Sequence, residues 1–124
     1  MQKVVGLFFI LTIIGFSFSS KQTGKKVNWI SFEEAEKKME TKELPVIVDV
    51  YTDWCGWCKV MDSKTYSKGQ VADYLNEKFY AMKFNAESRN DIKWRGKIYR
   101  YDSQKRIHSL ALALITGEIG RAHV

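Results

Sequence analysis

The sequence predicts a single small domain of the α/β class. Its 124 residues, 45% of them apolar, are enough for one packed core and exclude a wholly disordered chain. Short β-branched runs alternate along the chain with segments of helical periodicity, which is typical of α/β folds. The two cysteines are too few for a disulfide-dense secreted scaffold or for a four-cysteine zinc site.

The first 19 residues have the pattern of a signal peptide. A positively charged start precedes the uncharged run Val4–Phe18, which is shorter than the roughly 20 apolar residues that a membrane-spanning helix needs. The small residues Ser17 and Ser19 favour cleavage after Ser19, and residues 20–26 then form a polar linker. We therefore expect an exported protein, in the periplasm of a bacterium. The alternative is that the segment stays uncleaved and tethers the chain to the membrane.

The first elements of the domain follow from local signals. A short edge strand is expected at residues 27–30. Ser31 and Glu34 have the spacing of a capping box, which predicts a helix over residues 32–41. The run Val46–Tyr51 is short, β-branched and almost entirely apolar, which is typical of a strand buried on both faces.

Further elements are expected in the second half of the chain. In order, they are a helical stretch to about Ser63, a helix over Gln70–Lys78, a strand over Phe79–Phe84, a hairpin over Ile92–Tyr101 and a last helix over Ser103–Thr116. The last helix is expected to be capped by Asp102 or Ser103 and ended by Gly117. His108 is expected on the surface of this helix.

The residues that carry chemistry are Cys55-Gly56-Trp57-Cys58, between the predicted buried strand and a helix. In that context a Cys-x-x-Cys pair indicates a redox motif. Cys55 would lie at the helix N-terminus, where the helix dipole lowers the pKa of its thiol, so Cys55 should be more acidic and more exposed than Cys58. Cys58, one turn later, would attack the mixed disulfide formed at Cys55. Other uses of the pair are weaker, because a zinc site lacks two ligands and a c-type haem site needs histidine where Lys59 stands.

These residues resemble a known family. The segment Val46–Lys59 is similar to the thioredoxin superfamily, in which a strand with an aspartate leads to Trp-Cys-x-x-Cys-Lys. The pattern Asp-x-Tyr-x-Asp-Trp-Cys, starting at Asp49, also resembles the C-terminal thioredoxin-like domain of the disulfide interchange transporter DsbD and exported thioredoxin-related proteins.

The resemblance implies roles for individual residues. Cys55 matches the attacking cysteine and Cys58 the resolving one. Asp49 matches the buried aspartate that tunes the cysteines, and Asp62 matches an acidic residue near the second cysteine. The alternatives are a hydrogen-bonded strand residue for Asp49 and a solvated helix residue for Asp62. Trp54, Gly56 and Trp57 would form a docking surface around the sulfurs, the alternative for the tryptophans being packing alone.

The implied function is that of an exported thiol–disulfide oxidoreductase, more specifically a reductase of protein disulfides. Its redox group is the Cys55–Cys58 disulfide itself, so no other cofactor and no metal are expected. The expected partners are protein disulfides and a membrane or exported thiol electron donor, and the chain is expected to be a monomer. The alternative is a binding module, either a metal carrier that uses the same cysteines or a chaperone-like domain that uses the tryptophans.

The chain also departs from the thioredoxin pattern. That fold continues with a cis-proline loop, two strands and a final helix, whereas the single proline here, Pro45, precedes the active-site strand. Residues 119–124 resemble the translation of a common sequencing adapter. We therefore expect an incomplete thioredoxin-like fold over residues 27–118, followed by a non-native tail.

A basic stretch remains, from Lys93 to Arg106, with six basic residues against one acidic residue. Trp94, Tyr99 and Tyr101 interleave with these charges, a pattern found in proteins that bind single-stranded nucleic acid. An exported protein rarely meets that ligand, so no nucleic-acid partner is expected. The stretch is expected to be a solvated hairpin, or a surface that docks acidic partners or a membrane.

Overall fold

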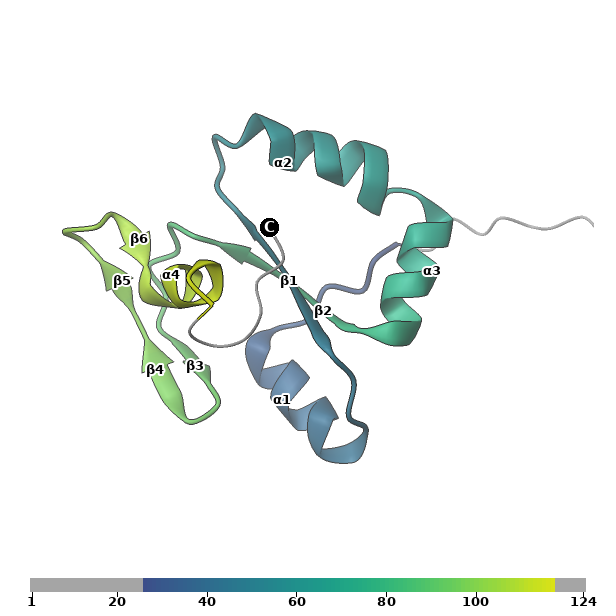
Figure 1. Cartoon of the computed structure of the whole chain (residues 1–124), viewed down its shortest axis with the longest axis horizontal. Helices are drawn as coiled ribbons and strands as arrows, with labels where there is room; N and C mark the ends of the chain where they lie inside the picture. The colour runs from purple at the N-terminus through teal and green to yellow at the C-terminus, as the bar shows by residue number, and fades with distance from the viewer. Residues whose placement is uncertain (1–25, 118–124) are drawn as a thin grey trace, which may run out of the picture.

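The computed structural model describes residues 26–117, and they form the expected α/β fold in three layers (Figure 1). Two parallel strands, β1 and β2, form the middle layer. Helices α1 and α4 pack on one face, and α2 and α3 lie on the other (Figure 1). The bounds of these elements are α1 Phe32–Thr41, β1 Val46–Tyr51, α2 Gly56–Met61, α3 Gly69–Lys78, β2 Tyr80–Asn85 and α4 Ser109–Ile115. Within residues 26–117, every helix is too short or too polar to cross a bilayer.

Helix α1 begins and ends where the sequence predicts. The Ser31 hydroxyl accepts a hydrogen bond from the backbone N–H of Glu34 at 3.1 Å, which satisfies one of the free donors of the first turn. The Glu34 side chain instead lies 3.4 Å from Lys38, one turn further along the helix. The expected edge strand before α1 is reduced to a single bridge, between Trp29 and Ala81.

The register of the central strands decides which side chains share a face. Val46, Val48 and Val50 of β1 pack toward α1 and α4, so the alternate residues point to the face of α2 and α3. Asp49 lies directly opposite Lys83 in the parallel pair. This register places a carboxylate beside an ammonium on the second face.

Strand β1 is less buried than predicted. All six of its residues are half-buried, whereas the apolar sequence favoured burial on both faces. The strand is partly exposed because, among residues 26–117, only β2 pairs with it. The other edge of β1 has no strand beside it in this part of the chain.

The larger core lies between the sheet and helices α1 and α4. Its aromatic centre is Phe32, whose ring meets Phe84 edge-on at 5.6 Å and Trp94 at 5.4 Å. Met82 and Leu110 are completely buried in it. A smaller core under α3 contains Val27, Ala72, Leu75 and Ala81.

Helix α2 does not continue to Ser63 as a regular α-helix. It changes at Asp62 into a π-helical turn, η1, over Asp62–Tyr66. The π turn is closed by a backbone hydrogen bond from Ser67 N–H to the Asp62 carbonyl, at 3.1 Å. A π turn of this kind is uncommon and is often found at functional sites.

The predicted hairpin is confirmed, with strands β3 (Ile92–Trp94) and β4 (Lys97–Tyr99). Its two turn residues, Arg95 and Gly96, both have positive φ, 50° and 77°, as the tight hairpin turn requires.

The expected start of the last helix at Ser103 is wrong. A second hairpin takes its place, with β5 (Tyr101–Asp102) paired to β6 (Ile107–His108). The Asp102 carboxylate does accept backbone N–H groups, from Gln104 at 2.9 Å and Lys105 at 3.0 Å. Arg106 then adopts a left-handed φ of 56°, which turns the chain back instead of letting a helix propagate. Helix α4 therefore begins only at Ser109, and Gly117, with φ 77°, follows its end as predicted.

The expectation that His108 lies on the surface is also wrong. His108 is completely buried and caps α4, its Nδ1 accepting from the Leu110 N–H at 3.1 Å. Its Nε2 lies 3.0 Å from the Asn90 carbonyl, and its ring meets Phe84 edge-on at 5.0 Å. Both ring nitrogens therefore have partners, which is the condition for burying an imidazole.

Candidate active site

The candidate site centres on a disulfide between Cys55 and Cys58, whose Cα atoms are 5.3 Å apart. Strand β1 ends at Tyr51, and a tight turn closed by a 3.1 Å bond from Cys55 N–H to the Thr52 carbonyl leads directly into α2. Cys55 is the N-cap of that helix, and its sulfur accepts a 3.2 Å hydrogen bond from the backbone N–H of Cys58. Both cysteines are half-buried. The first sulfur therefore lies where free backbone donors point at it, which favours negative charge once the disulfide is reduced.

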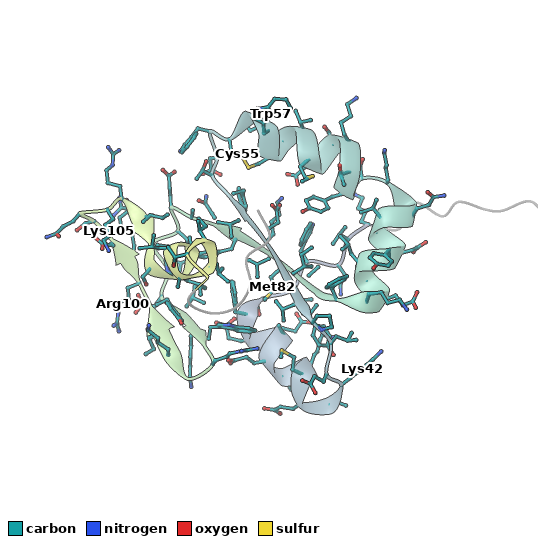
Figure 2. All side chains as sticks on the ribbon, viewed as in Figure 1. Lys42, Cys55, Trp57, Met82, Arg100 and Lys105 are labelled. Carbon is teal, nitrogen blue, oxygen red and sulfur yellow. A yellow bond between two sulfur atoms is a disulfide. The ribbon has the colours of Figure 1, made fainter. Side chains whose placement is uncertain are left out.

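The two tryptophans around the disulfide are highly exposed. Trp54 is 76% and Trp57 84% solvent-accessible, and Figure 2 shows Cys55 and Trp57 on the same end of α2. The Trp54 indole N–H donates to the Glu87 carboxylate at 3.1 Å, which fixes one of the two rings. Gly56, between the cysteines, has open space where a side chain would start. The structure thus places all three residues of the predicted docking surface beside the sulfurs and at the protein surface.

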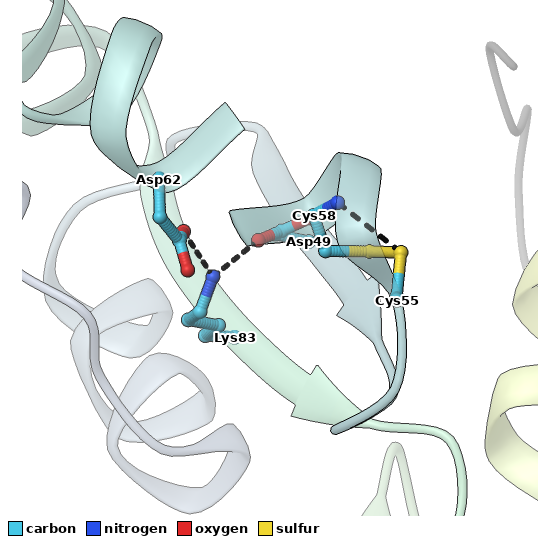
Figure 3. The surroundings of a disulfide bond; sticks show 5 residues. All are labelled: Asp49, Cys55, Cys58, Asp62 and Lys83. Carbon is cyan, nitrogen blue, oxygen red and sulfur yellow. Dashed lines mark hydrogen bonds and ion pairs between the residues drawn. A yellow bond between two sulfur atoms is a disulfide. The ribbon is translucent and has the colours of Figure 1, made fainter. Parts of the chain in front are cut away.

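A charged cluster on the sheet face toward α2 holds the other two predicted site residues (Figure 3). Lys83 Nζ lies 2.6 Å from Asp49 Oδ2 and 2.6 Å from Asp62 Oδ1. Asp49 comes from β1, Lys83 from β2 and Asp62 from the beginning of η1. One ammonium group therefore joins the active-site strand to the helix that carries the cysteines.

Aromatic rings surround this ammonium group. Lys83 Nζ is 5.2 Å from the centroid of Trp29, 5.0 Å from Tyr51 and 5.6 Å from Tyr66. The faces of such rings attract a cation, so they stabilise a charge that is only 22% exposed. The π turn brings Tyr66 into this group, where it meets the Trp29 ring edge-on at 5.0 Å.

The environment shifts the pKa of two members of the cluster. Burial lowers the pKa of the Lys83 ammonium, but the hydrogen bonds to Asp49 and Asp62 exceed that effect and raise the pKa above its usual value. Burial, together with the nearby charge of Asp49, raises the pKa of Tyr66. Lys83 is therefore a fixed positive charge at physiological pH.

Asp62 is connected to the second cysteine through the backbone. As the residue that ends α2, it donates its N–H to the carbonyl of Cys58. Its carboxylate, 46% exposed, reaches to Lys83, whereas the Asp49 side chain is only 14% exposed. In this oxidised form the partner of Asp49 is thus Lys83. The two predicted carboxylates meet at one cation, which the sequence interpretation did not include.

Lys83 is the residue of the candidate site that sequence reasoning missed. The signal was its position as the only charged residue in Tyr80–Asn85, a strand otherwise suited to the core. An ammonium in such a strand requires a carboxylate partner. The register of β1 and β2 supplies that partner as Asp49.

The described residues offer no ready metal site. Between residues 26 and 117, no group of three or more His, Cys, Asp or Glu side chains comes together as metal ligands would.

Comparison with known proteins identifies a family. The profile of Thioredox_DsbH, described as "Protein of unknown function, DUF255", matches residues 16–105. This range covers β1, the cysteine pair, the charged cluster and both strands of the first hairpin.

Curated relatives match over a shorter range. The uncharacterized protein B0495.5 of Caenorhabditis elegans is 30% identical over 67 residues, which are 53% of this chain and 9% of that protein. Spermatogenesis-associated protein 20 from rat and from human is 27% identical over 67 residues, 53% of this chain and 8% of each relative. The chain therefore spans less than a tenth of these relatives. No solved structure matches it significantly.

Proposed function

Because the chain belongs to the thioredoxin-like DUF255 family, we propose that it is an exported thiol–disulfide oxidoreductase, one that reduces protein disulfides through Cys55 and Cys58. The observation that carries the proposal is the disulfide at the start of α2, directly after the central strand. A disulfide that only held the fold together would not need this place at a helix N-terminus between two exposed tryptophans.

The reaction proceeds in two exchanges. In the reduced protein, the Cys55 thiolate attacks one sulfur of a substrate disulfide, whose S–S bond breaks and whose other sulfur leaves as a thiol after taking up a proton. The deprotonated Cys58 then attacks the Cys55 sulfur of the mixed disulfide. This step releases the second substrate thiol and forms the Cys55–Cys58 disulfide. Two electrons have passed to the substrate, so an exported or membrane thiol donor must reduce the pair again.

The charged cluster is assigned the proton exchange that these steps need. Cys58 must lose a proton before it attacks, and a carboxylate on the adjacent strand is the kind of group that accepts it. Lys83 holds the Asp49 carboxylate in place by direct contact, at 2.6 Å, and so positions the acceptor. Asp62 shares the same cation and joins this arrangement to the helix that carries Cys58.

Two finer parts of the proposal depend on sequence pattern alone. Export to the periplasm rests on the apolar run in residues 1–19, which lie outside the described residues. Likeness to the DsbD domain rests on the pattern that starts at Asp49. The incomplete fold and the adapter-like tail also remain predictions, because residues 118–124 lie outside the described range and the end of the sequence does not test them. Sequencing the source gene across residue 118 tests that part directly.

One observation favours the second candidate function, a chaperone-like binding module. Trp54 and Trp57 are the most exposed large apolar side chains among the described residues, and such rings bind unfolded segments without any redox step. A binding module would keep its affinity for unfolded chains after both cysteines are replaced. A metal carrier would instead purify with about one copper or zinc ion per chain.

The decisive experiment measures reduction of a protein disulfide by the full chain and by three variants. Cys55→Ser and Cys58→Ser should each lower the rate by on the order of a thousandfold or more, because each exchange needs its own sulfur. Cys58→Ser should also accumulate a mixed disulfide through Cys55, visible as a mass increase that a reductant removes. Gln104→Ser, an exposed change in the turn between β5 and β6, is the control and should keep the wild-type rate. Equal rates in all four proteins would refute the proposal.

A further inference from the structure

The strongest feature outside the candidate site is a basic surface on the two hairpins, here called the hairpin patch. It consists of seven exposed side chains between residues 89 and 106: Arg89, Lys93, Arg95, Lys97, Arg100, Lys105 and Arg106. The same segment has only two acidic residues, whereas the other described residues hold nine basic and eleven acidic ones. The positive charge is therefore concentrated on one part of an otherwise slightly acidic domain.

The fold gathers these charges at one end of the molecule. Figure 1 shows both hairpins on the side opposite α3, and Figure 2 places Arg100 and Lys105 along that outer edge. Arg95 lies in the tight turn of the first hairpin, and Lys105 and Arg106 lie in the turn of the second. The Asp91 carboxylate neutralises Arg100 at 3.1 Å, and Asp102 is used by the backbone of its own turn. The other basic side chains of the patch are exposed to solvent, Arg89, Arg95 and Lys97 also lying over aromatic rings.

The aromatic residues of this segment decide against nucleic acid. Single-stranded nucleic acid binds by stacking its bases on exposed rings between basic side chains. Trp94 and Tyr99 are only 4% and 6% exposed, because they pack into the core against α1. Tyr101 is half-buried, with the Arg89 guanidinium 4.5 Å from its ring centroid. The rings that suggested a stacking platform belong to the interior.

An apolar side chain lies among the outward charges instead. Ile98 is 51% exposed and faces the same side as Lys93, its partner across the hairpin. Basic side chains around an exposed aliphatic one suit a lipid headgroup layer, where the charges meet phosphates and the apolar group enters the interface. In the alternative in which residues 1–19 stay uncleaved, the apolar run Val4–Phe18 would itself hold the domain at a bilayer. The short linker after this run is also basic, with Lys21, Lys25 and Lys26.

We propose that the hairpin patch docks the domain on an anionic phospholipid surface, through Lys93, Arg95, Lys105 and Arg106 with Ile98 at their side. Trp57 lies on α2 and Trp54 in the turn before it, whereas the patch lies on the two hairpins. The docking does not depend on the redox function, since no residue of the patch belongs to the candidate active site.

The test compares binding of the full chain to vesicles made of equal parts phosphatidylglycerol and phosphatidylcholine with binding to pure phosphatidylcholine. The patch variant is Lys93→Gln/Arg95→Gln/Lys105→Gln/Arg106→Gln. The control variant is Lys37→Gln/Lys42→Gln/Lys64→Gln/Lys68→Gln, which removes the same net charge from exposed lysines elsewhere. Both variants keep the apolar N-terminal run, so its contribution to binding cancels. Circular dichroism and melting of each variant establish that it is folded.

The patch variant should bind the anionic vesicles at least about tenfold more weakly than wild type, and the control variant less than about threefold more weakly. Wild-type binding should also weaken as salt is added, and all three proteins should bind phosphatidylcholine alike. Equal losses in the two variants would attribute the effect to net charge and refute the patch. If the patch variant kept its vesicle binding but lost binding to polyglutamate, the surface would be a protein-docking site and the lipid proposal would be wrong.

Discussion

The two faces of the β1–β2 sheet accommodate polar groups in different ways. On the face toward α2, two carboxylates from different elements meet at the Lys83 ammonium group, and three aromatic rings surround it. On the face toward α1 and α4, the core is apolar around one imidazole, that of His108, which is bonded to the backbone alone. The charged cluster at Lys83 is tolerated because opposite charges balance, whereas the His108 imidazole is tolerated because the buried ring is neutral.

This difference means that the residues expected to control reactivity and those expected to control stability lie on different faces of the sheet. Buried ion clusters contribute little net stability, because desolvation offsets most of their attraction. Close apolar packing is what stabilises a small domain. We therefore expect changes on the α2 face to alter reactivity and its pH dependence, and changes on the α1/α4 face to alter the free energy of unfolding.

The largest effect expected is the loss of packing on the α1/α4 face. Leu110→Ala should lower the free energy of unfolding by about 2–5 kcal/mol, because Leu110 is completely buried and its removal leaves a cavity. The reduction potential of the disulfide should stay unchanged. Urea unfolding of the oxidised protein measures the first quantity, and equilibration with glutathione measures the second.

The control for this variant is Ile115→Ala, on the same helix but with its side chain 53% exposed. It should cost less than about 1 kcal/mol, because little apolar surface is lost from the interior. Equal costs for the two variants would mean that α4 does not pack on the sheet as described. A changed potential in Leu110→Ala would show that the two faces are not independent.

An intermediate effect is expected on the α2 face. Asp49→Asn should keep the fold, slow disulfide reduction by about tenfold and shift its pH profile, because the proposed proton acceptor is gone. Stability should change little, since Lys83 keeps Asp62 as a partner at 2.6 Å. The pH dependence of single-turnover reduction is the measurement.

Asp53→Asn is the matched control for this change. It removes the same charge from the exposed loop next to Cys55, so it should leave the pH profile as it is. If both variants change the rate and the pH profile of disulfide reduction equally, Asp49 acts only through the overall electrostatic field. If Asp49→Asn matches wild type at every pH, Asp49 is structural, and the role assigned to Lys83 fails with it.

How far the sequence predicted the molecule depends on whether the signal was local. Ser31 with Glu34, the run Val46–Tyr51 and the pair Cys55–Cys58 are signals within a few residues, and the elements they predicted are in place. The partnership of Asp49 with Lys83 joins residues 34 positions apart. It depends on strand register, which neither local segment specifies.

The prediction for the second half of the chain was wrong for a related reason. Ile107, Leu110, Ala111 and Leu114 have helical spacing, so the helix was extended back to Ser103. Pairing with β5 keeps Ile107 and His108 in a strand, and the left-handed Arg106 has no sequence signature, because glycine is the residue usually found there. The burial of His108 depends on the distant Asn90 carbonyl and on the packed Phe84 ring. None of these contacts can be read from a local pattern.

The smallest effect expected concerns this buried imidazole. Burial lowers the pKa of His108 below its usual value, against a smaller opposite effect of its bond to the Asn90 carbonyl. A histidine that is harder to protonate in the folded state stabilises the protein fully above the pKa of the unfolded chain, about 6.5, and progressively less below it. The free energy of unfolding should therefore fall as the pH is lowered from about 7 through about 6.5 and below.

His108→Asn isolates that contribution. Asparagine can still cap α4 by accepting the Leu110 N–H, but it does not titrate, so the variant should lose stability overall and also lose this part of the pH dependence. Urea unfolding of both proteins across that pH range gives the two slopes. On the α2 face the pKa of Lys83 is raised, so its stabilising contribution is complete in this range and is lost only in strong alkali. Any difference in slope between the two proteins therefore reports on the α1/α4 face. Parallel slopes would mean that His108 takes up a proton in the folded state as easily as in the unfolded one, and that this core is open to water.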